Sequence, residues 1–245
     1  MAQATDDVKV FRNMALTPTP PSRMMGPLPV GFLEEVSMRV LVIADDYWHP
    51  GDVARAGLDL LEDHEFDYIY DAGQWSAEAM LDYPVVLFVK SNNISQQNRD
   101  NWMMPAVEVA FVDYVRRGGG LLVVHSGTAG YRETAVFREL LGGVFEHHPK
   151  QCPVTITPHA GHPLCEGAVE FTIQDEHYHM IVDDRDVDTF VTTNSEHGEQ
   201  PGAWTRIEGE GRVCVLTPGH NVEVWQHPSF QALLRNSLAW CAGQG

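Results

Sequence analysis

RRGGGLLVVHSGTAGY, residues 116–131, is the stretch that decides the fold. Its glycine run at 118–120 ends a helical pattern, and the apolar residues 121–124 then lead directly into His125 and a series of small residues. A short apolar run bounded by glycines predicts a buried parallel strand. Parallel sheets bind ligands beyond the carboxyl ends of their strands, so His125 is a candidate site residue. The alternative is a histidine that caps the next helix or fills the rim of the sheet.

Apolar runs and helical patterns alternate on both sides of this strand. Such alternation predicts an α/β fold, in which helices cover both faces of a mainly parallel sheet, with additional strands in the C-terminal half. The strands are expected at residues 38–44, 66–70, 85–89, 121–124, 154–157, 171–173, 189–193, 203–207 and 213–217. The helices are expected at residues 53–64 after an Asp52 N-cap, as a weak turn at 76–81, and at 105–117, 133–141 and 230–241.

The length of 245 residues fits one sizeable α/β domain. Residues 1–37 differ from the rest, because prolines are crowded there and no periodicity is sustained. We predict a disordered or extended N-terminal tail over residues 1–37 and a domain over residues 38–245. The tail lacks the apolar core of a signal peptide.

The formal net charge of −18 argues against nucleic acid or an anionic membrane as a partner, since both would repel the surface. The four cysteines form no CxxC pair, and we interpret them as reduced, mostly buried thiols of a cytoplasmic protein. No apolar run reaches the 18 residues or so that a membrane span needs.

Histidines follow several of the predicted strands. His49 follows the first strand, His125 the central one and His220 the last, while Glu176 comes shortly after the strand at 171–173. Three imidazoles and one carboxylate at one rim would suit Zn²⁺ or another divalent metal, and they make His125, Glu176 and His220 the catalytic candidates. The alternative is a set of scattered rim residues, because no HxH or HExxH spacing is present.

Other chemistries have weak support. Ser126 lacks a GxSxG elbow, so it is a candidate substrate contact and a poor nucleophile. The glycines at 118–120 precede the strand, which argues against a phosphate loop and a nucleotide cofactor. Aromatic side chains near the rim fit the binding of a sugar and fit core packing equally well. These candidates are Tyr47, Trp48, Tyr131, Tyr178 and Trp225.

Several motifs, in this order and spacing, resemble the ThuA-like family, named for trehalose utilisation, of the class I glutamine amidotransferase-like superfamily. They are GGGLLVVHSG (118–127), FRELLGGVFEHHP (137–149), GHPLCEG (161–167), DEHY (175–178), PGAW (201–204), GEGRVCVLTPGH (209–220) and WQHPSFQALLRNSLAW (225–240). The resemblance covers about residues 38–245. It implies a flavodoxin-like three-layer sandwich and a pocket lined by His49, His125, Glu176, Tyr178 and His220.

The same resemblance implies that this chain does not use the chemistry of the class I amidotransferases. Class I amidotransferases carry a cysteine at the elbow after the central strand, where this chain has His125. His220 matches their late histidine and Glu223 approximately matches their glutamate. Without the thiol, release of ammonia from glutamine through a thioester is not available.

Three functions follow as hypotheses. ThuA-like proteins are associated with sugar catabolism, so the first is a metal-assisted hydrolase, lyase or isomerase of a sugar or keto-sugar. The second is a non-catalytic domain that binds a small metabolite, which the missing cysteine favours. A working amidotransferase is the least favoured. A homo-oligomer is expected on base rates alone.

Overall fold

The computed structural model describes residues 37–183 and 187–244. Residues 1–36 of the predicted tail lie outside the described residues. The first described strand, β1, spans Met38–Ala44, as predicted.

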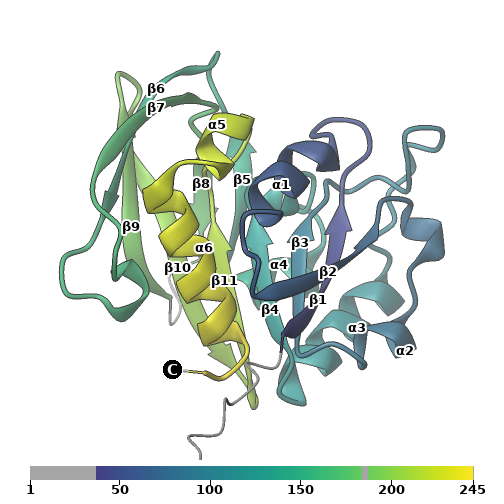
Figure 1. The fold of residues 1–245 in the computed structure, drawn as a ribbon. Helices are drawn as coiled ribbons and strands as arrows, with labels where there is room; N and C mark the ends of the chain where they lie inside the picture. The colour runs from purple at the N-terminus through teal and green to yellow at the C-terminus, as the bar shows by residue number, and fades with distance from the viewer. Residues whose placement is uncertain (1–36, 184–186, 245) are drawn as a thin grey trace, which may run out of the picture. The chain divides into compact units, whose positions relative to one another are not determined.

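Nine strands form one sheet in the order β2-β1-β3-β4-β11-β10-β9-β6-β7 (Figure 1). The first five pair in parallel and the last four extend the sheet with antiparallel pairs. The parallel part comprises β1, β2 (His64–Ile69), β3 (Val85–Val89), β4 (Gly120–Val124) and β11 (Gly211–Leu216). The antiparallel part comprises β10 (Gly198–Glu208), β9 (Asp188–Ser195), β6 (Cys152–Pro158) and β7 (Phe171–Asp175).

Helices cover both faces of the sheet, which confirms the predicted flavodoxin-like sandwich (Figure 1). One apolar cluster packs alternate residues of β1, such as Val40 and Val42, against α1, α5 and α6. The other packs Leu41 and Ile43 against α2, α3 and α4. The helices are α1 (Gly51–Leu58), α2 (Ala77–Met80), α3 (Pro105–Arg116), α4 (Ala135–Leu141), α5 (Val222–Trp225) and α6 (Pro228–Cys241).

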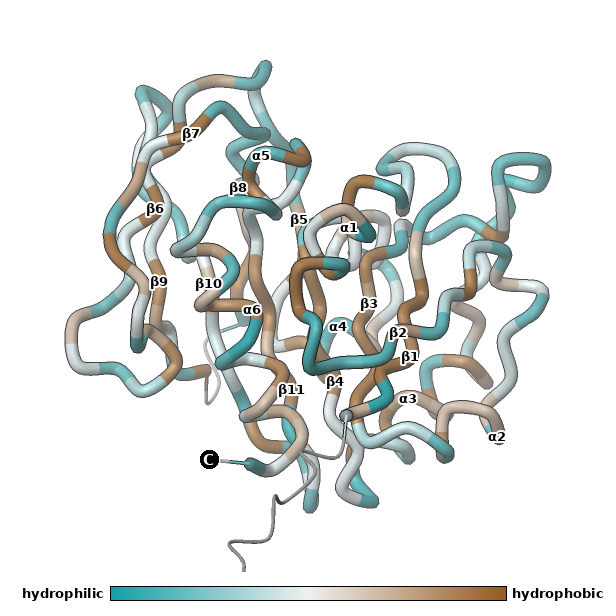
Figure 2. Tube along the Cα trace, viewed as in Figure 1, coloured by the Kyte–Doolittle hydropathy of each residue, from teal (hydrophilic) through white to brown (hydrophobic). Residues whose placement is uncertain are grey.

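Hydropathy along the chain follows this arrangement. The central strands β3, β4 and β11 are strongly hydrophobic, and hydrophilic loops lie beyond their carboxyl ends (Figure 2). Every residue of β3 and β4 is buried, because helices cover both of their faces. The carboxyl edge is therefore where polar side chains can gather on a rigid support.

Some elements differ from expectation. The first helix ends at Leu58 and not near residue 64, because Leu58 and Leu61 are both buried while the chain turns toward β2. Asp52 lies in the first turn of that helix, whose N-cap is Pro50. A separate antiparallel pair, β5 (Gly143–His147) with β8 (His179–Val182), and the short helix α5 were not predicted.

Candidate functional site

His125 lies at the sharp turn between β4 and the short 3₁₀ helix η2 (His125–Thr128). Its φ of 45° makes it the one non-glycine residue with positive φ among residues 37–183 and 187–244. This backbone conformation costs a β-carbon-bearing residue about 1–2 kcal/mol, so the surrounding structure must hold it there. The side chain is fully buried, directly above the carboxyl end of the central strand.

The hydrogen bond of the His125 ring determines its tautomer. Nδ1 lies 2.7 Å from the carbonyl oxygen of Thr217, which can only accept, so Nδ1 carries the proton. Burial lowers the pKa of His125 to about 4, and the ring is therefore neutral at pH 7. Its other nitrogen, Nε2, then presents a lone pair to Glu176 Oε2 at 3.5 Å.

Two further imidazoles approach the same carboxylate oxygen. Glu176 Oε2 lies 3.1 Å from His220 Nδ1 and 3.6 Å from His49 Nε2. His49 is on the loop after β1, His220 on the loop after β11, and Glu176 between β7 and β8. Four segments far apart in the sequence thus meet at one point, where one ligand atom from each residue lies within 4.8 Å of the others.

The electrostatics of Glu176 follow from these neighbours. Burial alone would raise the pKa of Glu176, but the interactions with His125, His220 and His49 outweigh burial and hold that pKa far below its usual range. The interaction with Glu176 raises the pKa of His220. The carboxylate is therefore ionised at neutral pH.

The donor set fits a divalent metal ion. Glu176 Oε2, His125 Nε2 and His220 Nδ1 are buried and have no hydrogen-bond partner within the described residues. Two ligands of a tetrahedral zinc ion with bonds of about 2.0–2.1 Å lie about 3.3 Å apart, close to the distances from Glu176 Oε2 to the three nitrogens. A metal-binding histidine typically donates its second ring N–H to a carbonyl, as His125 does to Thr217. This His₃Glu group could hold a metal ion.

Asp175 orients the loop that carries His220. Its two carboxylate oxygens accept hydrogen bonds from the backbone N–H groups of Gly219 and His220, both at 2.9 Å. Burial raises the pKa of Asp175 to about 6. The neighbouring Trp225 donates from Nε1 to the carbonyl oxygen of Gly219 at 2.8 Å. Two buried side chains thus position the backbone that holds His220.

A cavity of about 410 Å³ opens beside the four residues, and Tyr178 and Trp48 line it. The Tyr178 ring stacks on the His125 ring at 3.9 Å between centroids, and its hydroxyl lies 3.4 Å from His49 Nε2. Trp48 is 59% exposed at the cavity mouth. Both positions are consistent with the predicted substrate contacts.

The structure does not support three other predicted substrate contacts. Ser126, Tyr131 and Trp225 are fully buried and do not line this cavity. Each instead donates a hydrogen bond to a backbone carbonyl: Ser126 to Val89, Tyr131 to Lys90 and Trp225 to Gly219. Their role is to support the loops of the site. Glu223 is exposed and forms no hydrogen bond or ion pair with His220 in the described part of the chain.

Sequence reasoning missed other groups around the site. Asp175 belongs to the DEHY motif but was given no role. The loop residues Ser91, Asn93 and Arg99 were not singled out, although they line the cavity. The signal was available for Ser91 and Asn93, because they directly follow β3, at the same edge as His49 and His125. His148 Nε2 lies 3.7 Å from Glu176 Oε1, and His148 lines the cavity.

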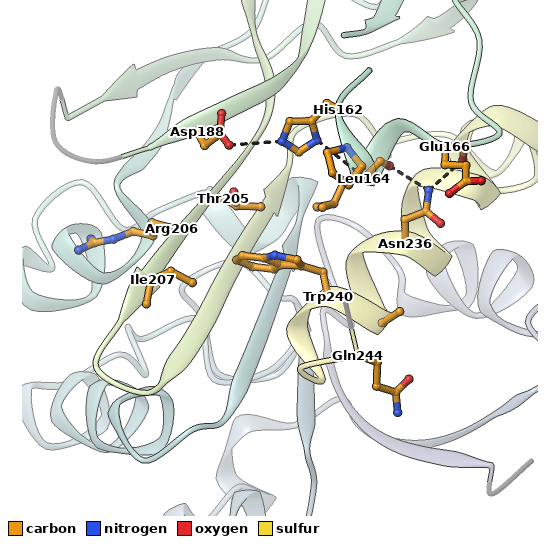
Figure 3. Close-up of a pocket in the computed structure, with 12 residues that line it drawn as sticks. His162, Leu164, Glu166, Asp188, Thr205, Arg206, Ile207, Asn236, Trp240 and Gln244 are labelled. Carbon is orange, nitrogen blue, oxygen red and sulfur yellow. Dashed lines mark hydrogen bonds and ion pairs between the residues drawn. The ribbon is translucent and has the colours of Figure 1, made fainter. Parts of the chain in front are cut away.

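A second, larger cavity of about 730 Å³ lies between η3 (Pro163–Cys165), β10 and α6 (Figure 3). His162 pairs there with Asp188 at 3.3 Å, and Asn236 donates to the carbonyl oxygens of Leu164 and Glu166. These polar groups satisfy one another and gather no set of metal-binding side chains. The chemistry-bearing groups are therefore concentrated at the carboxyl edge of the sheet.

The fold and this edge define an α/β protein whose central parallel strand ends at a buried histidine with positive φ, His125. The four cysteines are free and buried. The family model described as "Trehalose utilisation" (ThuA) matches residues 39–241, and the chain belongs to this family.

Solved structures share the fold. A ThuA-like protein from Bacteroides uniformis is 18% identical with a TM-score of 0.70, over 88% of this chain and 95% of that one. A ThuA-like protein from Parabacteroides merdae is 19% identical with a TM-score of 0.66, over 84% and 90%. A β-galactosidase from Rahnella sp. is 13% identical with a TM-score of 0.58, over 84% of this chain and 31% of that one. The comparison with curated proteins gave no match. No helix of the described residues is long and apolar enough to cross a membrane.

Proposed function

We propose that the protein is a metal-dependent enzyme that acts on a sugar or keto-sugar. The observation that carries the proposal is the His₃Glu group, whose four candidate ligand atoms lie within 4.8 Å of one another beside a cavity of about 410 Å³. Membership of the trehalose-utilisation family supports a carbohydrate as the substrate class.

The four residues His49, His125, Glu176 and His220 would hold the ion. Three nitrogens and one carboxylate oxygen favour zinc. A bound divalent metal supplies a Lewis acid that polarises a carbonyl group or lowers the pKa of water. Hydrolysis, elimination and isomerisation of a sugar derivative all use such an acid.

The protein's own groups have separate roles in this proposal. Glu176 acts as a ligand or as a general base, because its carboxylate is ionised and lies at the cavity. Tyr178 orients the substrate through its hydroxyl and fixes the His125 ring by stacking. Asp175 keeps His220 in position through the backbone.

The proposal also includes the class of ligand, the cellular location and the oligomeric state. The net charge of −18 is unfavourable for nucleic acid and anionic membranes, which leaves a small molecule as the ligand. The reduced state of four buried cysteines fits a cytoplasmic location. A homo-oligomer is expected for a domain of this kind.

The test combines metal analysis with activity. We expect the purified protein to contain about one divalent metal per chain and to turn over a 3-keto-glycoside, and His125→Ala and His220→Ala to lose both properties. His197→Ala is the matched control, because His197 lies on the surface beside Glu196. Unchanged metal content and turnover in both site variants would contradict the proposal. Ligand binding without any turnover would favour a non-catalytic binding domain.

A further inference from the structure

The two carboxylate oxygens of Glu176 lie in different surroundings. Oε2 is buried and faces the imidazoles of the His₃Glu group, the nearest nitrogen being 3.1 Å away. Oε1 lies 3.7 Å from Nε2 of a fourth histidine, His148, which is outside that group. Glu176 and His148 both line the cavity of about 410 Å³. Since Oε2 is buried, Oε1 is the oxygen of this carboxylate that a ligand in the cavity can reach.

Neighbouring groups fix the orientation of the His148 ring. Its Nδ1 lies 2.7 Å from the carbonyl oxygen of Pro149, which can only accept, so Nδ1 carries a proton and is used in this hydrogen bond. The ring also lies 5.8 Å from the Phe145 ring and 5.9 Å from the Tyr178 ring, between centroids. Nε2, on the other side of the ring, is therefore held toward Glu176 Oε1.

His148 belongs to a wall of the cavity that strands β5 and β8 build. It directly follows β5, and Tyr178 directly precedes β8, which pairs with β5. Phe145 of β5 packs on Tyr178 at 4.2 Å between ring centroids, and Tyr178 stacks on His125. These rings link the wall to the His₃Glu group, so the position of His148 relative to that group is fixed by packing.

The preceding histidine has no such position, although it lies in the same segment. The His147 ring stacks on the His179 ring at 4.5 Å between centroids, and its Nδ1 lies 3.7 Å from Glu146 Oε2. Its side chain is 61% exposed and does not line the cavity. Successive side chains of an extended segment point to opposite faces, which is why only His148 reaches the cavity.

The spacing of the two polar atoms indicates what they bind. At 3.7 Å, Nε2 of His148 and Oε1 of Glu176 are too far apart for a hydrogen bond to each other. A carboxylate oxygen accepts, and so does Nε2 of a neutral imidazole whose Nδ1 carries the proton. Two neighbouring acceptors need two donors, which hydroxyl groups on adjacent carbons of a sugar ring supply. Trp48 offers an apolar face for that ring in the same cavity.

We propose that His148 Nε2 and Glu176 Oε1 bind two adjacent hydroxyl groups of the sugar, and that His148 is the residue that selects for this diol. The diol is then held beside Oε2, the oxygen that we propose as a metal ligand. This assignment rests on the proposed function, because it takes the cavity beside the His₃Glu group as the substrate site. A site that hydrogen-bonds hydroxyl groups discriminates against ligands that lack them.

The experiment is a calorimetric titration of D-glucose and its 2-, 3- and 4-deoxy analogues into the full-length protein, with the metal content measured in each sample. We expect the wild-type protein to bind at least one deoxy analogue about tenfold more weakly than D-glucose. His148→Ala should bind D-glucose about tenfold more weakly, lose this discrimination and keep its metal. His148→Gln places an amide at a similar reach, so it should recover part of the affinity. His147→Ala is the matched control and should behave as the wild type does.

Four results would overturn the assignment. They are a wild-type protein that does not bind D-glucose, wild-type affinity in His148→Ala, an equal loss of affinity in His147→Ala, and loss of the metal from His148→Ala. The last result would show that His148 acts on the metal site through Glu176 and not on the sugar.

Failure of the proposed function gives a different pattern. Sugar binding that depends on His148, without turnover of a 3-keto-glycoside, would support the assignment and contradict catalysis. Turnover with an unchanged KM in His148→Ala would contradict the assignment and leave catalysis in place.

Discussion

The tautomer of His125 is the residue-scale basis of the proposed metal site. A neutral imidazole whose Nδ1 proton is donated to Thr217 O must direct its Nε2 lone pair at Glu176, 3.5 Å away. Two lone pairs facing each other in a buried site repel unless a cation or a proton lies between them. Since burial lowers the pKa of His125 to about 4, a proton there is disfavoured at neutral pH. A divalent cation is the partner that we propose for this pair.

Asp175 provides a test at this scale, because its hydrogen bonds hold the backbone of Gly219 and His220. Asp175→Asn leaves one acceptor oxygen for two N–H donors, so one of them loses its partner at a cost of about 1–3 kcal/mol. We expect the metal affinity to fall about 10–100-fold, as for other changes behind metal ligands. The measurement is competition with a chromophoric chelator.

Asp183→Asn is the control for Asp175→Asn. Asp183 pairs with Arg138 outside the site, and a partly exposed pair of this kind contributes little. Equal metal affinity in the two variants would contradict a positioning role for Asp175.

At the scale of elements, the loops after β1, β4 and β11 supply the three histidines, and short buried segments hold those loops in place. Trp225 of α5 and Trp204 of β10 are both fully buried and both donate to a carbonyl oxygen at 2.8 Å. Trp225 bonds Gly219, next to His220, whereas Trp204 bonds Leu141 at the end of α4. The two tryptophans are thus matched in burial and in hydrogen-bond length, and only Trp225 bonds a residue next to the site.

We expect Trp225→Phe and Trp204→Phe to lower the free energy of unfolding by similar amounts, about 1–3 kcal/mol, because each leaves a buried carbonyl without its donor. Only Trp225→Phe should also reduce metal affinity. Denaturant unfolding and chelator competition measure the two effects. A loss of affinity in both variants, in proportion to stability, would show that α5 has no specific link to the site.

The turn after His125 gives a further prediction about packing. A β-carbon at Gly127 would lie 2.3 Å from the carbonyl oxygen of Phe88 and 2.8 Å from Val123 Cγ1. Gly127→Ala should therefore destabilise the protein by about 1–3 kcal/mol or more in thermal or denaturant unfolding. At Gly73 a β-carbon would come closest to the Asp71 carboxylate, a surface group that can move, so Gly73→Ala is the control. Similar stability of the two variants would contradict the tight packing of η2 on β3.

The sequence predicted the parallel part of the sheet well, since buried strands such as 85–89 are continuous apolar runs with sharp glycine or polar boundaries. The carboxyl-edge rule also predicted that His49, His125 and His220 would approach one another. It did not predict β5 and β8, because their pairing depends on contacts with the rest of the fold. The sequence also could not predict that Ser126, Tyr131 and Trp225 are buried. Side chains with one polar group occur both at the rims of sheets and in protein cores.

At the scale of the whole molecule, the site joins distant parts of the chain. Its residues run from His49 to His220, and the sheet holds them through β1, β4, β7 and β11. A ligand that binds all four in the folded state alone must stabilise that state by mass action. The net charge of −18 also favours attraction of a cation.

We therefore expect zinc at about 1,000 times its dissociation constant to stabilise the chelator-treated protein by about 4 kcal/mol. For a chain of this size, that corresponds to a rise in Tm of about 8–16 °C. Differential scanning calorimetry measures the shift. Glu176→Gln and His125→Ala should show little of it, and an equal rise in these variants would assign the effect to other sites.

The most direct test of the proposed metal site is anomalous diffraction at the zinc edge, from crystals grown without chelator and soaked in zinc. We predict one strong peak about 2.0–2.2 Å from the ligand atoms of His49, His125, Glu176 and His220. Density without an anomalous signal at that position, in crystals that bind zinc elsewhere, would contradict it.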